Sequence, residues 1–118
     1  MLFDTNVLIA YLKGEYSVVS FLQETRSTLY VSVVTMIEIL ALSKLSKGEI
    51  GIIREFLKNF EIVELDTHVA LEAALLCRQF KMKVPDSVIA ATALYLHVPL
   101  ATRDKAFFKI KNLEIVEV

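Results

Sequence analysis

Four acidic side chains stand where a predicted strand ends or a predicted helix begins: Asp4, Glu38, Asp86 and Asp104. In an open parallel sheet, the carboxyl ends of the strands and the helix N-termini meet along one edge, where ligands bind. Carboxylates gathered there repel one another, and a divalent cation is the obvious way to neutralise them. Mg²⁺ or Mn²⁺ prefers such an all-oxygen environment. We therefore expect the four carboxyl groups to face one cavity, within reach of a shared ion.

Each acid also has a purely structural explanation. Thr35-x-x-Glu38 fits a capping box, with Thr35 as the N-cap of a helix. Asp86 falls in a first helical turn, where the helix dipole favours a negative charge. Asp104 can cap a short turn, and Asp4 can be a residue of an end-of-strand turn. Capping does not require acids at these places, because Ser or Thr would serve as well, so both explanations stay open.

Strands and helices alternate along the whole chain. The predicted strands are 2–4, 28–32, 61–65, 100–102 and 114–118, and the predicted helices are 6–13, 16–25, 35–46, 50–60, 67–80 and 85–97, with a helical turn at 105–109. This order indicates βαβ units. It predicts an α/β fold with a parallel sheet of about five strands and helices on both faces, which makes three layers. The first strand is very short, and Asp66 or Thr67 is expected to cap the helix that follows the third strand.

Length and composition fit one domain over residues 1–118. Hydrophobic residues make up 55% of the chain, enough for a buried core, and no segment is long and apolar enough for a membrane span. We see no secretory signal and only one cysteine, Cys77, so we expect a cytoplasmic protein. The two histidines, His68 and His97, fall away from the four acids, which does not favour zinc.

The net charge of −1 gives no evidence for a nucleic-acid partner. It does not exclude one either. Setting the four acids aside leaves ten acidic against 13 basic residues, a balance of +3 for the remaining surface.

Four motifs together resemble a known family. They are Asp4-Thr5-Asn6-Val7-Leu8-Ile9, Thr35-x-x-Glu38, Asp86-Ser87-Val88-Ile89-Ala90-Ala91-Thr92-Ala93 and Leu100-Ala101-Thr102-Arg103-Asp104-Lys105-Ala106-Phe107. In this order and spacing they are similar to the acidic motifs of PIN domains, small nucleases that include the VapC-type toxins of toxin–antitoxin pairs. The resemblance covers essentially the whole chain.

The resemblance implies a sheet in strand order 3-2-1-4-5 and a metal-dependent endoribonuclease. Asp4, Glu38, Asp86 and Asp104 would be catalytic and would hold Mg²⁺ or Mn²⁺. RNA would be the substrate, and a homodimer and a cognate antitoxin protein are implied as partners. The alternative is a PIN-like domain that acts in RNA processing, or that binds RNA or a partner without catalysis.

Four other side chains would support this chemistry. Asn6 and Thr102 would hold the carboxylates in orientation. Arg103 and Lys105 would contact phosphate groups, although a solvated basic surface explains them equally well.

Two other acid-based classes do not fit the first motif. A receiver-like phospho-acceptor domain requires adjacent carboxylates after the first strand, and an aspartyl phosphatase requires a second Asp two residues after the first. Thr5 and Asn6 occupy those places.

The predicted helix 6–13 is apolar almost all round, so something must cover it. With Val18, Phe21 and Leu22 it could form a dimer surface. Packing against other helices of the same chain is the alternative.

Overall fold

A five-stranded parallel sheet forms the centre of the computed structural model, which describes residues 1–118. The strands are β1 (Leu2–Phe3), β2 (Tyr30–Ser32), β3 (Glu61–Val63), β4 (Leu100–Thr102) and β5 (Ile115–Glu117). Their order is β3-β2-β1-β4-β5, and all neighbours are parallel. The expected fold class and strand order are confirmed.

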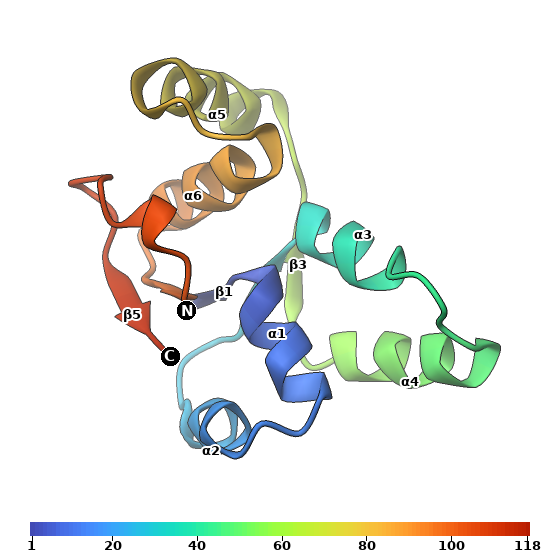
Figure 1. Cartoon of the computed structure of the whole chain (residues 1–118). Coiled ribbons are helices and arrows are strands. Elements are labelled where there is room, and N and C mark those ends of the chain that lie inside the picture. Colours follow the sequence, from blue (N-terminus) through green and yellow to red (C-terminus); the bar gives the residue numbers. More distant parts are fainter.

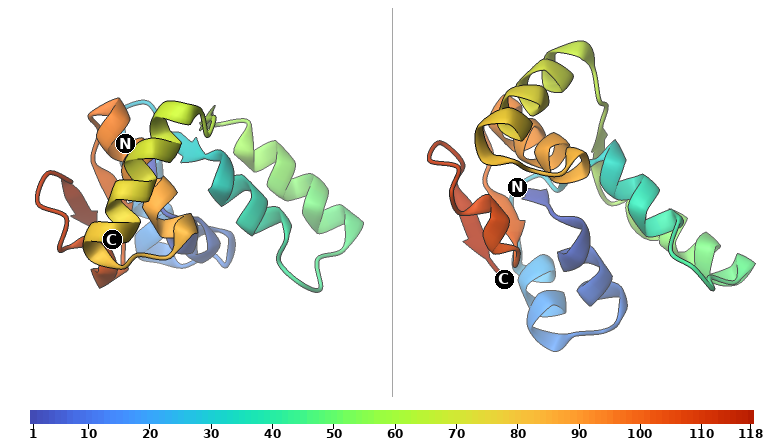
Figure 2. Two further views of the ribbon diagram at one scale, coloured as in Figure 1. Left: turned by 90° about the horizontal axis from the view of Figure 1, so that it is seen from above. Right: turned by 45° about the horizontal axis from the view of Figure 1, so that its top comes forward.

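Helices cover both faces of the sheet (Figure 1). They are α1 (Thr5–Leu12), α2 (Tyr16–Glu24), α3 (Val33–Leu40), α4 (Lys47–Leu57), α5 (Thr67–Phe80) and α6 (Val84–Leu96), with a 3₁₀ turn η1 at Lys105–Phe107. The pair α5 and α6 lies on one face, and α1 and α2 lie on the other. The pair α3 and α4 projects sideways as a helical hairpin, clearest in Figure 2. No helix is both long and apolar enough to cross a membrane.

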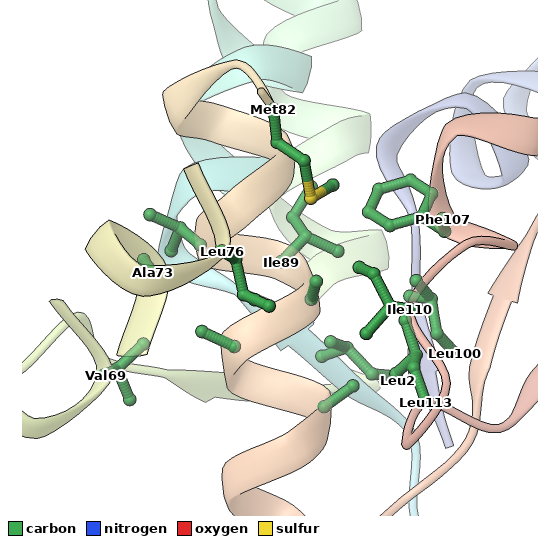
Figure 3. Packing of buried hydrophobic residues seen from close by; sticks show 14 residues of the cluster. Leu2, Val69, Ala73, Leu76, Met82, Ile89, Leu100, Phe107, Ile110 and Leu113 are labelled. Atoms are coloured by element: carbon green, nitrogen blue, oxygen red, sulfur yellow. The ribbon is translucent and has the colours of Figure 1, made fainter. Parts of the chain in front are cut away.

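The central strand β1 has only two residues, and their side chains pack on opposite faces of the sheet. Leu2 belongs to the hydrophobic cluster under α5 and α6, shown in Figure 3, whereas Phe3 belongs to the cluster under α1 to α4. Successive side chains of a strand point to opposite faces, so two residues suffice to connect both layers. The ring of Phe3 packs edge-on against Phe21 and Phe60, with centroids 6.3 and 5.9 Å away.

The predicted helices 35–46 and 50–60 differ from the observed ones at both ends: α3 already ends at Leu40 and α4 at Leu57, and both begin earlier than expected. Helix α3 begins at Val33 and not at Thr35, because Ser32 is its N-cap and accepts a hydrogen bond from the Val34 amide at 3.1 Å. Helix α4 begins at Lys47 because Ser46 and Glu49 form a capping box. The sequence Ser-x-x-Glu was overlooked there because Gly48 suggested a break.

Residues of the same chain cover the apolar first helix. Val7, Leu8 and Ala10 are buried, and so are Val18 and Leu22 of α2. These residues pack with the sheet and with α3 and α4 in one cluster. The side chains on which the expected dimer surface rested are therefore mostly core residues of the monomer.

Candidate active site

The four acids come from four separate elements at the carboxyl edge of the sheet. Asp4 follows β1 and caps α1, and Asp104 follows β4 and caps η1. Strands β1 and β4 are neighbours, with Phe3 paired to Ala101, so the two strands end within one residue of each other. Asp86 lies in the first turn of α6, and Glu38 lies inside α3. The fold thus brings together acids that are up to 100 positions apart in the sequence.

Asp4 is the buried member of the group, with 4% of its surface exposed. Its pKa is raised to about 6, mainly by burial, and the charges of Asp86 and Asp104 raise it further. Two hydrogen bonds oppose this shift: the Thr102 hydroxyl donates to Oδ2 at 2.7 Å and the Thr5 amide donates to Oδ1 at 2.8 Å. Both carboxylate oxygens of Asp4 are therefore held in place.

Glu38 is not part of a capping box. Thr35 lies inside α3, so it is not the N-cap, and the Glu38 carboxylate points instead to another helix. The hydroxyl of Thr5 in α1 lies 2.6 Å from Oε1 of Glu38 and 2.9 Å from the hydroxyl of Thr35. The structural explanation for Glu38 that the sequence allowed is thereby removed.

Asp104 and Asp86 differ in their surroundings. Oδ1 of Asp104 accepts a hydrogen bond from the Ala106 amide at 2.9 Å, so its capping role is real. The pKa of Asp86 is raised, first by burial and then by the charges of Asp104 and Glu38, while Lys83 lowers it. No hydrogen bond contributes to that shift, so the Asp86 carboxylate is the least restrained of the four.

The four carboxylates share one electrostatic neighbourhood but do not converge on one point. No three His, Cys, Asp or Glu side chains lie close enough together to hold an ion, so a site that four carboxylates share around one ion stays a prediction. The all-oxygen donor set fits a hard divalent ion, which would favour the charged form of Asp4 against the burial, and the neighbouring charges, that raise its pKa.

Comparison with known proteins decides the family. The family model of the PIN domain matches residues 1–113. The chain belongs to the PIN domain family. PIN domains are nucleases. Among curated proteins, no sequence matches this chain.

Solved structures agree with this assignment. A toxin–antitoxin complex from Klebsiella pneumoniae contains a chain 28% identical, with a TM-score of 0.87, over 98% of this PIN domain and 94% of that chain. FitAcB from Neisseria gonorrhoeae is 27% identical, with a TM-score of 0.79, over 97% and 94% of the two chains. VapBC2 from Rickettsia felis bound to a promoter DNA fragment shares the fold, with a TM-score of 0.86 at 20% identity, over 99% and 97%.

Of the supporting side chains expected in this PIN domain, Thr102 lies against Asp4, whereas Asn6 is exposed and forms no hydrogen bond with an acid. Arg103 is engaged elsewhere: it pairs with Glu15 at 2.7 Å, and its Nε donates to the Val118 carbonyl at 2.8 Å. Lys105 is exposed beside Asp104.

The sequence did not indicate Thr5 as the hydrogen-bond partner of Glu38, or Thr35 as the partner of Thr5. A signal was present in α3: with the N-cap at Ser32, Thr35 and Glu38 both lie inside the helix, three residues apart on one face. Asp66 behaves as predicted, since it caps α5 by accepting a hydrogen bond from the Val69 amide at 2.9 Å.

Proposed function

We propose that this PIN domain is a metal-dependent endoribonuclease that hydrolyses RNA phosphodiester bonds. The observation that supports this proposal most directly is the cluster of four acids whose charges act on one another at the β1–β4 edge. Asp4, Asp86 and Asp104 would hold Mg²⁺ or Mn²⁺, and Glu38 would be a further ligand or would orient the attacking water. Such an ion, when bound, lowers the pKa of water and neutralises charge developing on the phosphate.

The protein's own side chains would prepare this chemistry. Thr102 and the Thr5 amide fix both oxygens of Asp4, so that carboxylate needs little reorganisation to bind a cation. The Asp86 carboxylate has no hydrogen-bond partner, so it is free to change its orientation when a cation binds. Lys105, exposed next to Asp104, would contact an RNA phosphate. No side-chain nucleophile is required.

The proposed biological role is that of the toxin of a toxin–antitoxin pair, with a cognate antitoxin as partner. The similar structure from Klebsiella pneumoniae is a toxin–antitoxin complex, which supports this role. An apolar cavity of about 390 Å³ between α1 and α4 would accept an antitoxin segment, and its apolar lining is Ile9, Leu12, Leu42, Leu45, Ile52 and Ile53.

We also propose a homodimer, but on a different surface from the one first expected. Leu71 and Leu75 lie one helical turn apart on α5 and are 65% and 58% exposed. Two large apolar side chains on one exposed helical face favour a protein interface there.

A cleavage assay on structured RNA tests the proposed activity. The wild-type protein should cleave with Mg²⁺ or Mn²⁺ and should be inactive in chelator. Asp4→Asn should lower the rate by at least about 100-fold, more than loss of an outer hydrogen-bonding partner typically causes. Asp66→Asn is the matched control, because it changes an acid outside the cluster and keeps a capping side chain. Cleavage that persists in chelator or in Asp4→Asn would overturn the mechanism.

A further inference from the structure

We propose that Thr5, supported by Thr35, is a positioning residue that fixes the Glu38 carboxylate by binding one oxygen, Oε1, and leaves Oε2 available to a metal ion or water. This inference rests on the proposed nuclease function. It gives a positioning role in that site to two residues that are not among the four acids.

The contact between Thr5 and Glu38 has the character of a strong hydrogen bond. Its length, 2.6 Å, falls in the range of hydroxyl–carboxylate bonds, which are roughly twice as strong as neutral ones. Thr5 has a single hydroxyl proton, and the carboxylate is a better acceptor than the neutral Thr35 oxygen. The Thr5 proton is therefore donated to Glu38, and the Thr35 hydroxyl, 2.9 Å away, donates to Thr5 in turn.

Burial makes this arrangement specific. Thr35 is fully buried and Thr5 is 8% exposed, so water does not compete for either hydroxyl. Chained hydrogen bonds in such surroundings polarise one another, which strengthens the bond to Glu38. Glu38 itself is only partly buried and has a long side chain with many rotamers, so it needs such a restraint to keep one orientation.

Thr5 also links Glu38 to a second acid. Its amide donates to Oδ1 of Asp4, while its hydroxyl serves Glu38, 33 positions away on another helix. One residue thus sets the relative placement of two proposed metal ligands. A threonine with a merely structural role looks different: Thr92, also buried, donates to the Val88 carbonyl of its own helix.

The test compares Thr5→Val, which removes the hydroxyl and keeps the shape, with Thr5→Ser, which keeps the hydroxyl. Mn²⁺ affinity is measured by calorimetry on RNA-free protein, and kcat and KM are measured at saturating Mn²⁺. Thr5→Val should bind Mn²⁺ about 10-fold more weakly and lose about 10-fold in kcat with KM unchanged, and Thr5→Ser should restore both. Thr92→Val, the matched control, should leave both unchanged. In a Glu38→Ala background, Thr5→Val should change Mn²⁺ affinity by less than about 2-fold, because the partner is gone.

Each outcome is decisive. Wild-type Mn²⁺ affinity and kcat in Thr5→Val, failure of Thr5→Ser to restore them, or an undiminished loss in the Glu38→Ala background overturns the inference and leaves the nuclease proposal intact. A wild-type protein that binds Mn²⁺ in a Thr5-dependent way without cleaving RNA supports the positioning role and overturns the nuclease proposal. A wild-type protein that binds no Mn²⁺ overturns both.

Discussion

The hydroxyl of Thr102 lies 2.7 Å from Oδ2 of Asp4, although the two residues are 98 positions apart in the chain. The contact joins β4 to β1, the neighbouring strands at the centre of the sheet. The same hydroxyl accepts a hydrogen bond from the Asp104 amide at 3.0 Å. One threonine therefore connects two of the four acids, as Thr5 connects Asp4 to Glu38 from the other side.

The first prediction concerns Thr102→Val, which removes this hydroxyl. Oδ2 of Asp4 then loses its donor, and the pKa of Asp4 should rise further because that hydrogen bond lowers it. We expect a loss of about 10- to 100-fold in Mn²⁺ affinity or in RNA cleavage, measured by calorimetry and single-turnover kinetics. Thr102→Ser keeps the donor and should stay near wild type. Equal losses in both variants would contradict this account.

The second prediction concerns pH and the stability of the metal-free protein. The pKa of Asp4 rises from its ordinary value of 3.8 to about 6 on folding, so the folded state binds the Asp4 proton more tightly. The contribution of Asp4 should therefore become less favourable as pH rises from about 4 to 6, by up to about 3 kcal/mol, and stay constant above. Denaturant unfolding in the presence of chelator measures the free energy of unfolding at each pH. Asp4→Asn should reduce the dependence of this free energy on pH between about 4 and 6. An unchanged dependence would show that other groups cause it.

The third prediction separates capping from the site. Asp66 caps α5 and Asp104 caps η1, each by accepting a hydrogen bond at a carboxylate oxygen. Asp66→Ala should lower the free energy of unfolding by about 0.5–2 kcal/mol without changing cleavage per folded molecule. Asp104→Ala should abolish cleavage as well. Thermal unfolding and an RNA cleavage assay on the same samples distinguish the two variants. If both variants lose activity only in proportion to their loss of folded protein, both acids act only through stability.

The fourth prediction concerns the basic side chains. Lys105→Gln should weaken RNA binding at every sequence tested and reduce the slope of log affinity against log salt by about 1, as expected for one lost phosphate contact. Arg103→Gln should change that slope less, because its guanidinium is already paired with Glu15. Binding titrations at several salt concentrations, with cleavage blocked by Asp4→Asn, provide the measurement. A larger change of the salt slope in Arg103→Gln than in Lys105→Gln would show that Arg103, and not Lys105, contacts the phosphate.

The fifth prediction concerns the core beneath the site. Phe3 is fully buried against Phe21 and Phe60. Phe3→Ala should cost about 3–5 kcal/mol by leaving a cavity in the central strand of the sheet. Phe3→Leu should cost less because it fills more of that space. Chemical denaturation of both variants measures the difference, and a cost for Phe3→Ala below that of Phe3→Leu would refute the packing argument.

The sequence predicted the parallel sheet and the helices between its strands, because alternating elements are local patterns. The assignment of the four acids to one site stays a prediction. The sequence did not predict that Glu38 depends on Thr5, because that contact joins positions 33 apart through tertiary packing. The predicted start of α3 was Thr35, because Ser32 is the last residue of a predicted β-branched strand. Ser32 and Thr35 can both act as an N-cap, and the structure shows that Ser32 does. The ion pair of Arg103 was not predicted because its partner, Glu15, becomes a neighbour only after folding.

The two-residue length of β1 has a consequence for how this chain tolerates insertions and deletions. Adding or removing one residue before Asp4 would exchange the faces of Leu2 and Phe3 or shift Asp4 by about 3.3 Å along the strand. Either change would separate Asp4 from Thr102 while leaving every side chain of the site in the sequence. The loop between α3 and α4, far from the sheet at the tip of the hairpin, has no such requirement (Figure 2). Changes in length should therefore accumulate there and be absent at the N-terminal strand.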